Sequence, residues 1–404
     1  PAFGKAWTYA SLKASYSLTA DRGPASNSLA VFQSFTPWRP STSANESAII
    51  LAALENSELT YEKKNELNIG VALGFVDNRI NVEFDWYRRN NFDLIGYTQT
   101  MGVGGVTTKL ANDATMESTG CEFTISTTNI KTKDFKWTTD WIFGWAENTI
   151  TKLDSRSQVY SLVNGVGRTE GRPIGALYSI PFAGLTEEGL PTFFIDAEHT
   201  QVVGPGNYAA IYFQEYENID YLKYEGTIDP KITGSFGNTF SWKGLKLNVF
   251  FTYSFGNVLR LDPLCPVYSS DYSDLTASMK EMKNRWMVPG DEQVTTIPSI
   301  PTVRQMREID ALSNAYSAYN YSTERVAKGD FIRLKELSLA YDLPKKVFEG
   351  QKAVSSFGVK FSATNLWLAY ADKKLNGRDP EYYNTGGVSS PNPRQFTLTV
   401  KLGF

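Results

Sequence analysis

Apolar and polar residues alternate with a period of two along several long segments of this chain. From Leu245 to Phe255, every second side chain is apolar and those between them are polar, with Phe250 as the exception. The aromatic residues of 134–146 and 230–242 are interspersed with Lys, Thr, Ser and Asp in a similar way. Successive side chains of a β-strand point to opposite faces, so this period predicts strands with one apolar and one water-facing side.

The same alternation predicts ten strands in all. They are expected at residues 7–18, 62–76, 79–97, 114–129, 134–150, 229–242, 244–258, 330–343, 355–370 and 394–404. Most of them reach the ~9–11 residues that a strand needs to cross a bilayer obliquely, and exceed the ~5–6 typical of soluble strands. No stretch approaches the ~20 consecutive apolar residues of a membrane helix, which excludes helical spanning but not spanning by strands.

The connections between the predicted strands alternate between brief and extended. The brief ones are 77–78, 130–133, 243 and 344–354, and the others are 19–61, 98–113, 151–228, 259–329 and 371–393. Outer-membrane barrels sort their connections in this way, with short periplasmic turns and long extracellular loops. We therefore expect an all-β fold, a transmembrane antiparallel β-barrel of the bacterial outer membrane, with 151–228 and 259–329 as large extracellular loops.

The second of these long loops carries one helical pattern. Apolar residues at helical spacing predict a helix near residues 274–287, with Asp274 as its N-cap and Pro289-Gly290 as its stop. We expect this apolar stripe to pack the loop onto the rim of the barrel rather than to form a groove for a partner.

Composition narrows the possible partners. The chain has 404 residues with 40 Lys and Arg against 43 Asp and Glu and no basic block, so no nucleic-acid partner is expected. Aromatic residues make up 14% of the chain, which suits a protein that lines a membrane interface or holds a ligand. Cys121 and Cys265 are expected to be free thiols, one of them facing lipid, rather than a disulfide.

No arrangement typical of catalysis is found. His199, the single histidine, lies in a predicted loop without the neighbours that a catalytic dyad or a metal site needs. We therefore expect no enzyme, no catalytic residue and no resident cofactor. Asp291-Glu292 and the pair Asp379 and Glu381 could hold Ca²⁺ in the loops, but their spacing matches no defined calcium loop, and paired surface acids are commoner.

The chain ends on an amphipathic strand. Five apolar side chains alternate there with polar ones: Phe396, Leu398, Val400, Leu402 and Phe404. A terminal strand that ends on Phe is similar to the signal read by the machinery that inserts outer-membrane barrels. A soluble protein that ends on a strand would also show part of this pattern.

Several motifs resemble one known family. Residues 329–344, GDFIRLKELSLAYDLP, are similar to the penultimate-hairpin motif of the SusC/RagA family of TonB-dependent transporters. The resemblance continues in Thr364-Asn365-Leu366-Trp367, in Arg378-Asp379-Pro380-Glu381 and in the final strand, and motifs in fixed order extend it over nearly the whole chain. Cys121 and Asp113 stand where Val-like and Gly-like residues are expected, which concerns local packing.

This resemblance implies a larger protein. The family has a 22-stranded barrel, an N-terminal plug domain and a motif that engages TonB. Only about ten strands are predicted in residues 1–404, and neither plug nor TonB-engaging segment is found there, so we expect the C-terminal portion of such a barrel. The resemblance implies import of oligosaccharides or oligopeptides across the outer membrane, with a SusD-like surface lipoprotein as lid, TonB acting through the missing N-terminal part, and outer-membrane lipid around the barrel.

Aromatic and charged residues of the predicted loops are candidates for contact with the ligand or the lid. They are Trp38, Arg39, Tyr268, Tyr272, Trp286, Tyr319 and Tyr382. Each of them could instead hold its loop together or lie in an aromatic girdle, and for any single residue that structural role is expected. Contact with a ligand or partner is a hypothesis for the set.

Three other functions stay open. A ten-stranded outer-membrane protease would cleave peptides, although His199 lies deep in a loop with no acidic dyad opposite. A soluble all-β carbohydrate-binding module would be extracted without detergent, which the alternating apolar faces argue against. A SusC-like protein recruited for assembly or secretion would share every feature above.

Overall fold

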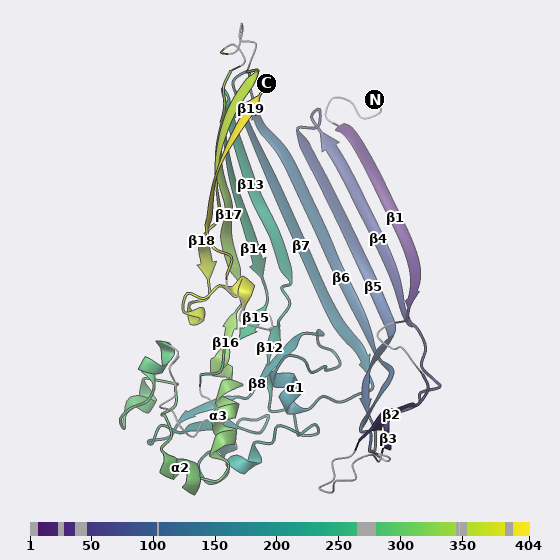
Figure 1. The fold of residues 1–404 in the computed structure, drawn as a ribbon, viewed down its shortest axis with the longest axis vertical. Helices are drawn as coiled ribbons and strands as arrows, with labels where there is room; N and C mark the ends of the chain where they lie inside the picture. Colours follow the sequence, from purple (N-terminus) through teal and green to yellow (C-terminus); the bar gives the residue numbers. More distant parts are fainter. Residues whose placement is uncertain are drawn as a thin grey trace.

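A computed structural model describes residues 7–22, 28–36, 47–102, 105–264, 280–344, 347, 354–383 and 391–404. It has two regions (Figure 1): a long curved sheet, and a group of short strands and helices at one end of it. The first strand begins and the last strand ends at the opposite end of the sheet, far from the short elements.

Ten antiparallel strands form the sheet. In spatial order they are β1 (Trp7–Asp21), β4 (Glu62–Phe75), β5 (Ile80–Gln99), β6 (Thr108–Lys131), β7 (Phe135–Leu153), β13 (Ile232–Trp242), β14 (Leu245–Phe255), β17 (Phe331–Asp342), β18 (Ser356–Ala371) and β19 (Gln395–Gly403). Each strand pairs with the sheet strand that precedes it in the chain, so the sheet is a continuous meander. The ten strand positions predicted from alternation are confirmed.

The largest boundary error is at β6, which begins at Thr108 rather than at residue 114. The tip of β6 pairs with the tip of β5 beyond an irregularity between Asn91 and Leu94, where Asp93 has φ 59°. An extra residue in a strand shifts the side-chain alternation to the other face. The period of two is therefore interrupted there, and the first part of β6 was not visible in the pattern.

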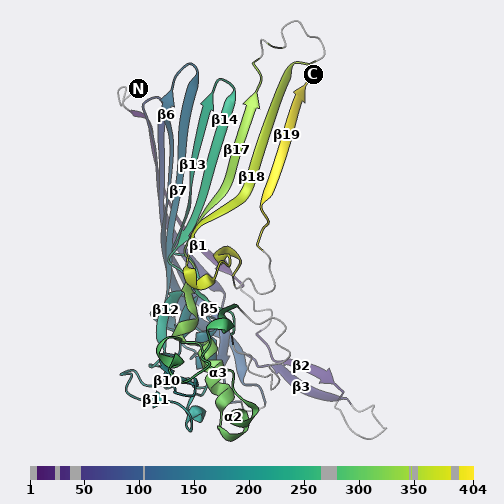
Figure 2. The same cartoon turned by 90° about the vertical axis from the view of Figure 1, so that its left-hand side faces the viewer.

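The sheet is open. β1 and β19 lie at its two edges, and within the described parts of the chain these two strands do not pair with each other. The view in Figure 2 shows the edge strands on separate sides of the curved surface. The described residues thus form a barrel-like wall with two free edges and not a closed barrel, which fits the expectation that they are only a portion of one.

Short and long connections lie at opposite ends of the sheet (Figure 1). The β4–β5 turn passes through Val76, Asp77 and Asn78, all with φ between 51° and 59°, and the β13–β14 turn uses Lys243 and Gly244 with φ 45° and 92°. Positive φ is what tight antiparallel turns require. The long connections all leave from the other end, as the sequence predicted.

The two longest connections form one folded unit, here called the loop domain (154–231 with the described residues of 256–330). Its elements are α1 (Val159–Val163), β8 (Ala176–Ser179), β9 (Phe182–Leu185), β10 (Pro191–Phe194), β11 (Val202–Val203), η1 (Tyr208–Ala210), β12 (Lys223–Thr227), β15 (Val258–Arg260), η3 (Lys280–Asn284), η4 (Asp291–Gln293), α2 (Val303–Glu308), α3 (Leu312–Asn320), η5 (Thr323–Arg325) and β16 (Val326–Lys328). Elsewhere lie the hairpin β2 (Val31–Phe35) and β3 (Ala48–Ala53), and the turns η7 (Lys373–Leu375) and η8 (Pro380–Tyr382).

The loop domain holds the largest apolar core of the described chain. Side chains from both connections meet in it, among them Phe193 and Tyr208 from the first and Leu312 and Tyr319 from the second. The hydroxyl of Tyr208 donates to the carbonyl of Pro191 at 2.9 Å, and burial raises the pKa of this phenol. Such an interior explains why connections this long keep a defined fold.

The helix predicted near 274–287 is wrong over the part that is described. Residues 280–284 form the 3₁₀ helix η3, and Trp286 then donates its backbone N–H to Ile297 across the loop, so the chain leaves a helical path. Residues 274–279 lie outside the described ones. Met282 of the apolar stripe does pack, but into the loop-domain core rather than onto the barrel rim. No helix within the described ranges is long and apolar enough to span a membrane.

Candidate functional site

The register of the sheet gathers the apolar residues of its strands on one face. Trp141 of β7 pairs with Phe236 of β13, which pairs with Phe251 of β14. At the far edge, Leu398 of β19 pairs with Phe361 of β18. Many side chains of this apolar face are exposed: Leu12, Tyr16, Ile69, Phe84, Trp141, Phe236, Leu339, Phe361, Phe396 and Leu398. Exposed apolar surface that runs across a whole sheet requires an apolar partner.

The five residues predicted as a barrel-insertion signal lie at the edge of this sheet. Phe396, Leu398, Val400 and Leu402 are on the apolar face of β19, and Phe404 follows the strand and is 90% exposed. Their role as a signal remains a prediction, because it concerns the assembly machinery.

The opposite, polar face carries charged and hydroxyl side chains. A cavity of about 450 Å³ lies on it, bordered by Lys246, Glu336, Lys360 and Lys401. The ammonium of Lys360 is 3.3 Å from the carboxylate of Glu336. Such side chains need water or polar partners, so the two faces of the sheet suit opposite surroundings.

Cys121 lies on the apolar face, between Trp86 of β5 and Trp145 of β7 in the register. Its thiol is free and partly exposed. This is the placement expected for the lipid-facing cysteine. Cys265 lies outside the described residues.

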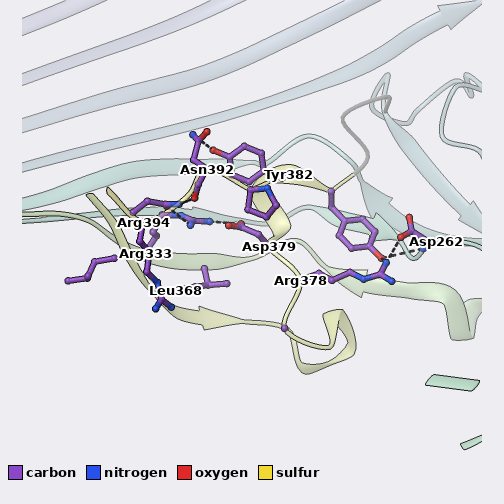
Figure 3. A pocket seen from close by; sticks show the side chains of 13 residues that line it. Asp262, Arg333, Leu368, Arg378, Asp379, Tyr382, Asn392 and Arg394 are labelled. Atoms are coloured by element: carbon purple, nitrogen blue, oxygen red, sulfur yellow. Dashed lines mark hydrogen bonds and ion pairs between the residues drawn. The ribbon is translucent and has the colours of Figure 1, made fainter. Parts of the chain in front are cut away.

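A cavity of about 620 Å³ lies where β17 begins and β18 ends, beside the connection from β18 to β19 (Figure 3). Arg333 of β17 is 3% exposed; it pairs with Asp379, and its Nη1 donates to Asn365 at 2.7 Å. Its Nε is also 3.2 Å from the carboxylate of Glu381. Two separate motifs of the sequence, the strand containing Arg333 and the segment 378–381, therefore form one buried ion-pair cluster.

A second ion pair borders the same cavity. Arg378 pairs with Asp262 and donates to the hydroxyl of Tyr383 at 2.9 Å (Figure 3). Burial by itself would lower the pKa of Arg378, but Tyr383 and Asp262 outweigh it, so the pKa is raised. The pair ties the β18–β19 connection to the second segment of the loop domain, just after β15.

Of the loop residues predicted to contact ligand or lid, Trp38, Arg39, Tyr268 and Tyr272 lie outside the described residues. The other three are not brought together. Trp286 packs over Gly189 and donates to Glu292 at 3.1 Å, Tyr319 is 1% exposed in the loop-domain core, and Tyr382 borders the cavity of Figure 3. The placement of Tyr319 favours a packing role.

Sequence reasoning did not single out Arg260, which holds the loop domain together. Its guanidinium donates to the carbonyls of Ser322 at 2.9 Å, Val163 at 3.2 Å and Tyr178 at 2.5 Å. Burial lowers its pKa to about 10, against the opposing effect of Glu225, so it is charged at neutral pH. Its partners lie up to 97 residues away, and no local pattern could have revealed them.

The acidic pairs considered for Ca²⁺ already have partners. Backbone N–H groups of Met287 and Val288 donate to Asp291, and Asp379 pairs with Arg333. Within the described part of the chain, no group of three or more His, Cys, Asp or Glu is arranged to hold a metal ion. His199 stacks on Phe194 in an exposed turn, with ring centroids 5.0 Å apart.

The sequence of this chain is similar to those of several TonB-dependent receptors. No protein-family model matches the chain. TonB-dependent receptor P3 of Formosa agariphila is 26% identical over 391 residues, which cover 88% of this chain and 35% of P3. TonB-dependent receptor SusC of Bacteroides thetaiotaomicron is 34% identical over 99 residues, which cover 24% of this chain and 10% of SusC.

Among solved structures, the RagAB peptide transporter superposes with a TM-score of 0.75 at 23% identity. The match covers 100% of this chain and 41% of the RagAB chain. It shows that the whole described chain has the fold of one part of that transporter. The chain spans about a third of the length of P3, so it corresponds to only part of such proteins.

Proposed function

We propose that this chain, which is SusC/RagA-like, forms part of the wall and the outer loops of a TonB-dependent importer in the bacterial outer membrane. The observation that carries the proposal is the separation of the two faces of the sheet. Exposed apolar side chains line one face of its strands, and charged or hydroxyl groups line the other. Hydrocarbon on one side and an aqueous lumen on the other satisfy both faces.

The free edges of the sheet support a larger barrel. Unpaired backbone N–H and C=O groups along β1 and β19 would each cost several kcal/mol in hydrocarbon, by the usual order of magnitude. Further strands must therefore pair with both edges. The relatives are much longer than this chain, which leaves room for the remaining strands of a 22-stranded barrel and for a plug domain.

The direction of the loops follows from the connections. Because outer-membrane barrels keep short turns in the periplasm, the loop domain faces outward in this proposal. Its position suits capture of an oligosaccharide or oligopeptide together with a SusD-like lipoprotein. TonB would act through the plug, and the present residues would bind and guide the ligand without bond chemistry.

The test measures uptake by cells that express the full-length receptor and its neighbouring lipoprotein. Fluorescent oligosaccharides and oligopeptides are supplied, and their periplasmic accumulation is compared between cells with and without TonB. We expect accumulation of one ligand class that requires both the receptor and TonB. Equal accumulation without TonB would contradict energised import, and extraction of the receptor from membranes without detergent would contradict the lipid-facing wall.

A further inference from the structure

A second cavity lies at the loop end of the sheet, where the tips of β5 and β6 meet α1 and the segments on either side of it. It measures about 530 Å³, within the ~300–1,000 Å³ typical of small-molecule sites. Its polar lining comes from both regions of the molecule: Tyr97, Gln99, Asp113, Arg156, Gln158 and Arg168. None of these residues takes part in the ion-pair cluster of Figure 3.

Positive charge is in excess in this cavity. Arg156 and Arg168 form no ion pair and donate no side-chain hydrogen bond within the described chain. The one carboxylate of the lining, Asp113, is 1% exposed and accepts hydrogen bonds from Thr98 at 3.2 Å and Ser155 at 2.7 Å. The donors of both guanidinium groups are therefore available to a ligand.

Arg168 is held in position at both ends. Its backbone N–H donates to the hydroxyl of Ser157 at 2.8 Å, and that hydroxyl donates to the carbonyl of Arg168 at 3.0 Å. Its guanidinium lies against Gly96 of β5, where an added Cβ would come within 3.2 Å of Nη1. A side chain at position 96 would therefore press on this guanidinium.

The remaining lining suits a hydroxyl-rich ligand. The amides of Gln99 and Gln158 can both donate and accept, and the ring of Tyr97 is 72% exposed and can stack on a sugar ring. A guanidinium binds a carboxylate through two parallel hydrogen bonds. We propose that this cavity binds the carboxylate of an acidic sugar within an oligosaccharide ligand, through Arg168 and Arg156.

This inference rests on the proposed function in one respect, which is that the ligand reaches the cavity from outside the cell. Its test does not require import. Binding of tri-galacturonate to the full-length receptor in detergent is measured by titration calorimetry without TonB. Maltotriose is the neutral control and tri-glutamate the peptide control. Arg304→Gln, on exposed α2 where Arg304 pairs with Glu308 at 2.8 Å, is the matched charge control.

We expect wild-type protein to bind tri-galacturonate at least tenfold more tightly than either control ligand. Arg168→Gln and Arg156→Gln should each weaken it about tenfold, the typical effect of one charge-assisted hydrogen-bond pair, whereas Arg304→Gln should not change it. Gly96→Ala should weaken binding by less than either arginine variant and without a change of charge, because its Cβ would shift the guanidinium by only a few tenths of an ångström. Thermal unfolding of each variant checks that the fold is intact.

Unchanged affinity in both arginine variants, an equal loss in Arg304→Gln, or no binding of tri-galacturonate would overturn the assignment. If tri-glutamate binds as tightly as tri-galacturonate, the assignment of an acidic sugar is overturned, and an acidic peptide is indicated as the ligand. If the receptor binds tri-galacturonate but shows no TonB-dependent uptake, that result contradicts the proposed function and leaves the assignment of this binding site intact.

Discussion

The sheet and the loop domain distribute their apolar residues in opposite ways. In the sheet, large side chains such as Leu12 and Leu398 are 75% and 67% exposed on a common face. In the loop domain, Phe193 and Tyr208 are fully buried, and partners from two distant connections surround them. The loop domain has a buried apolar core, as a water-soluble protein does, whereas the sheet requires an apolar environment on one face. Their responses to substitution should therefore differ.

The largest loss of stability is expected from a charge placed on the apolar face of the sheet. Phe84→Lys places an ammonium on that face, between Val71 and Phe123 in the register. We expect the free energy of unfolding in liposomes to fall by about 2–4 kcal/mol, because a charge facing hydrocarbon is poorly solvated. Its neighbour Glu83 points to the polar face, so Glu83→Lys is the matched control and should change little. Equal effects of the two variants would contradict opposite surroundings for the two faces.

The next effect is confined to the loop domain. Arg260→Met removes the donors to the carbonyls of Val163, Tyr178 and Ser322 and leaves them buried without these partners. We expect a loss of about 2 kcal/mol in local stability, the usual cost of stranding buried polar groups. Hydrogen exchange should rise in the loop domain and stay unchanged in the sheet. A parallel rise in both regions would show that they unfold as one unit.

Close packing within the sheet gives a smaller effect. A Cβ at Gly234 would lie 2.2 Å from the carbonyl oxygen of Ile142 and 2.4 Å from the hydroxyl of Tyr253, which crosses the glycine to donate to that same carbonyl. We expect Gly234→Ala to lower stability in liposomes by about 1–2 kcal/mol through this overlap. At Gly144 the nearest atom would be 3.6 Å away, so Gly144→Ala should be tolerated. Similar losses at both glycines would refute the overlap as the cause.

The smallest effect is a dependence on pH in one exposed turn of the loop domain. Hydrogen bonds from Thr200 and Gln201 lower the pKa of Asp196 below its usual 3.8. The carboxylate therefore stabilises the turn above pH 3.8, and this contribution is lost as pH falls through the lower pKa of the folded state. Amide exchange of Thr200 and Gln201 should rise over that range. Asp196→Asn should remove the dependence.

Sequence patterns predicted the sheet well and the loop domain poorly. Alternation located the strands, and the lengths of their connections predicted which ends of the strands lie together. The helix predicted near 274–287 was wrong over its described part, because hydrogen bonds across the loop, such as that from Trp286 to Ile297, decide the path there. The motif 378–381 was recognised, but its joining with Arg333 in one cluster was not.

What the sequence determined by itself is the solvent preference of each strand face. A strand has a side-chain period of two, so alternate residues of one short segment determine whether each face prefers an apolar or an aqueous environment. The tertiary structure alone decided the contacts between distant residues, such as Arg333 with Asp379, 46 residues apart, and Arg260 with Val163, 97 apart. Those contacts depend on how the connections fold back over the end of the sheet. The spacing of neighbouring residues in the sequence does not predict that path.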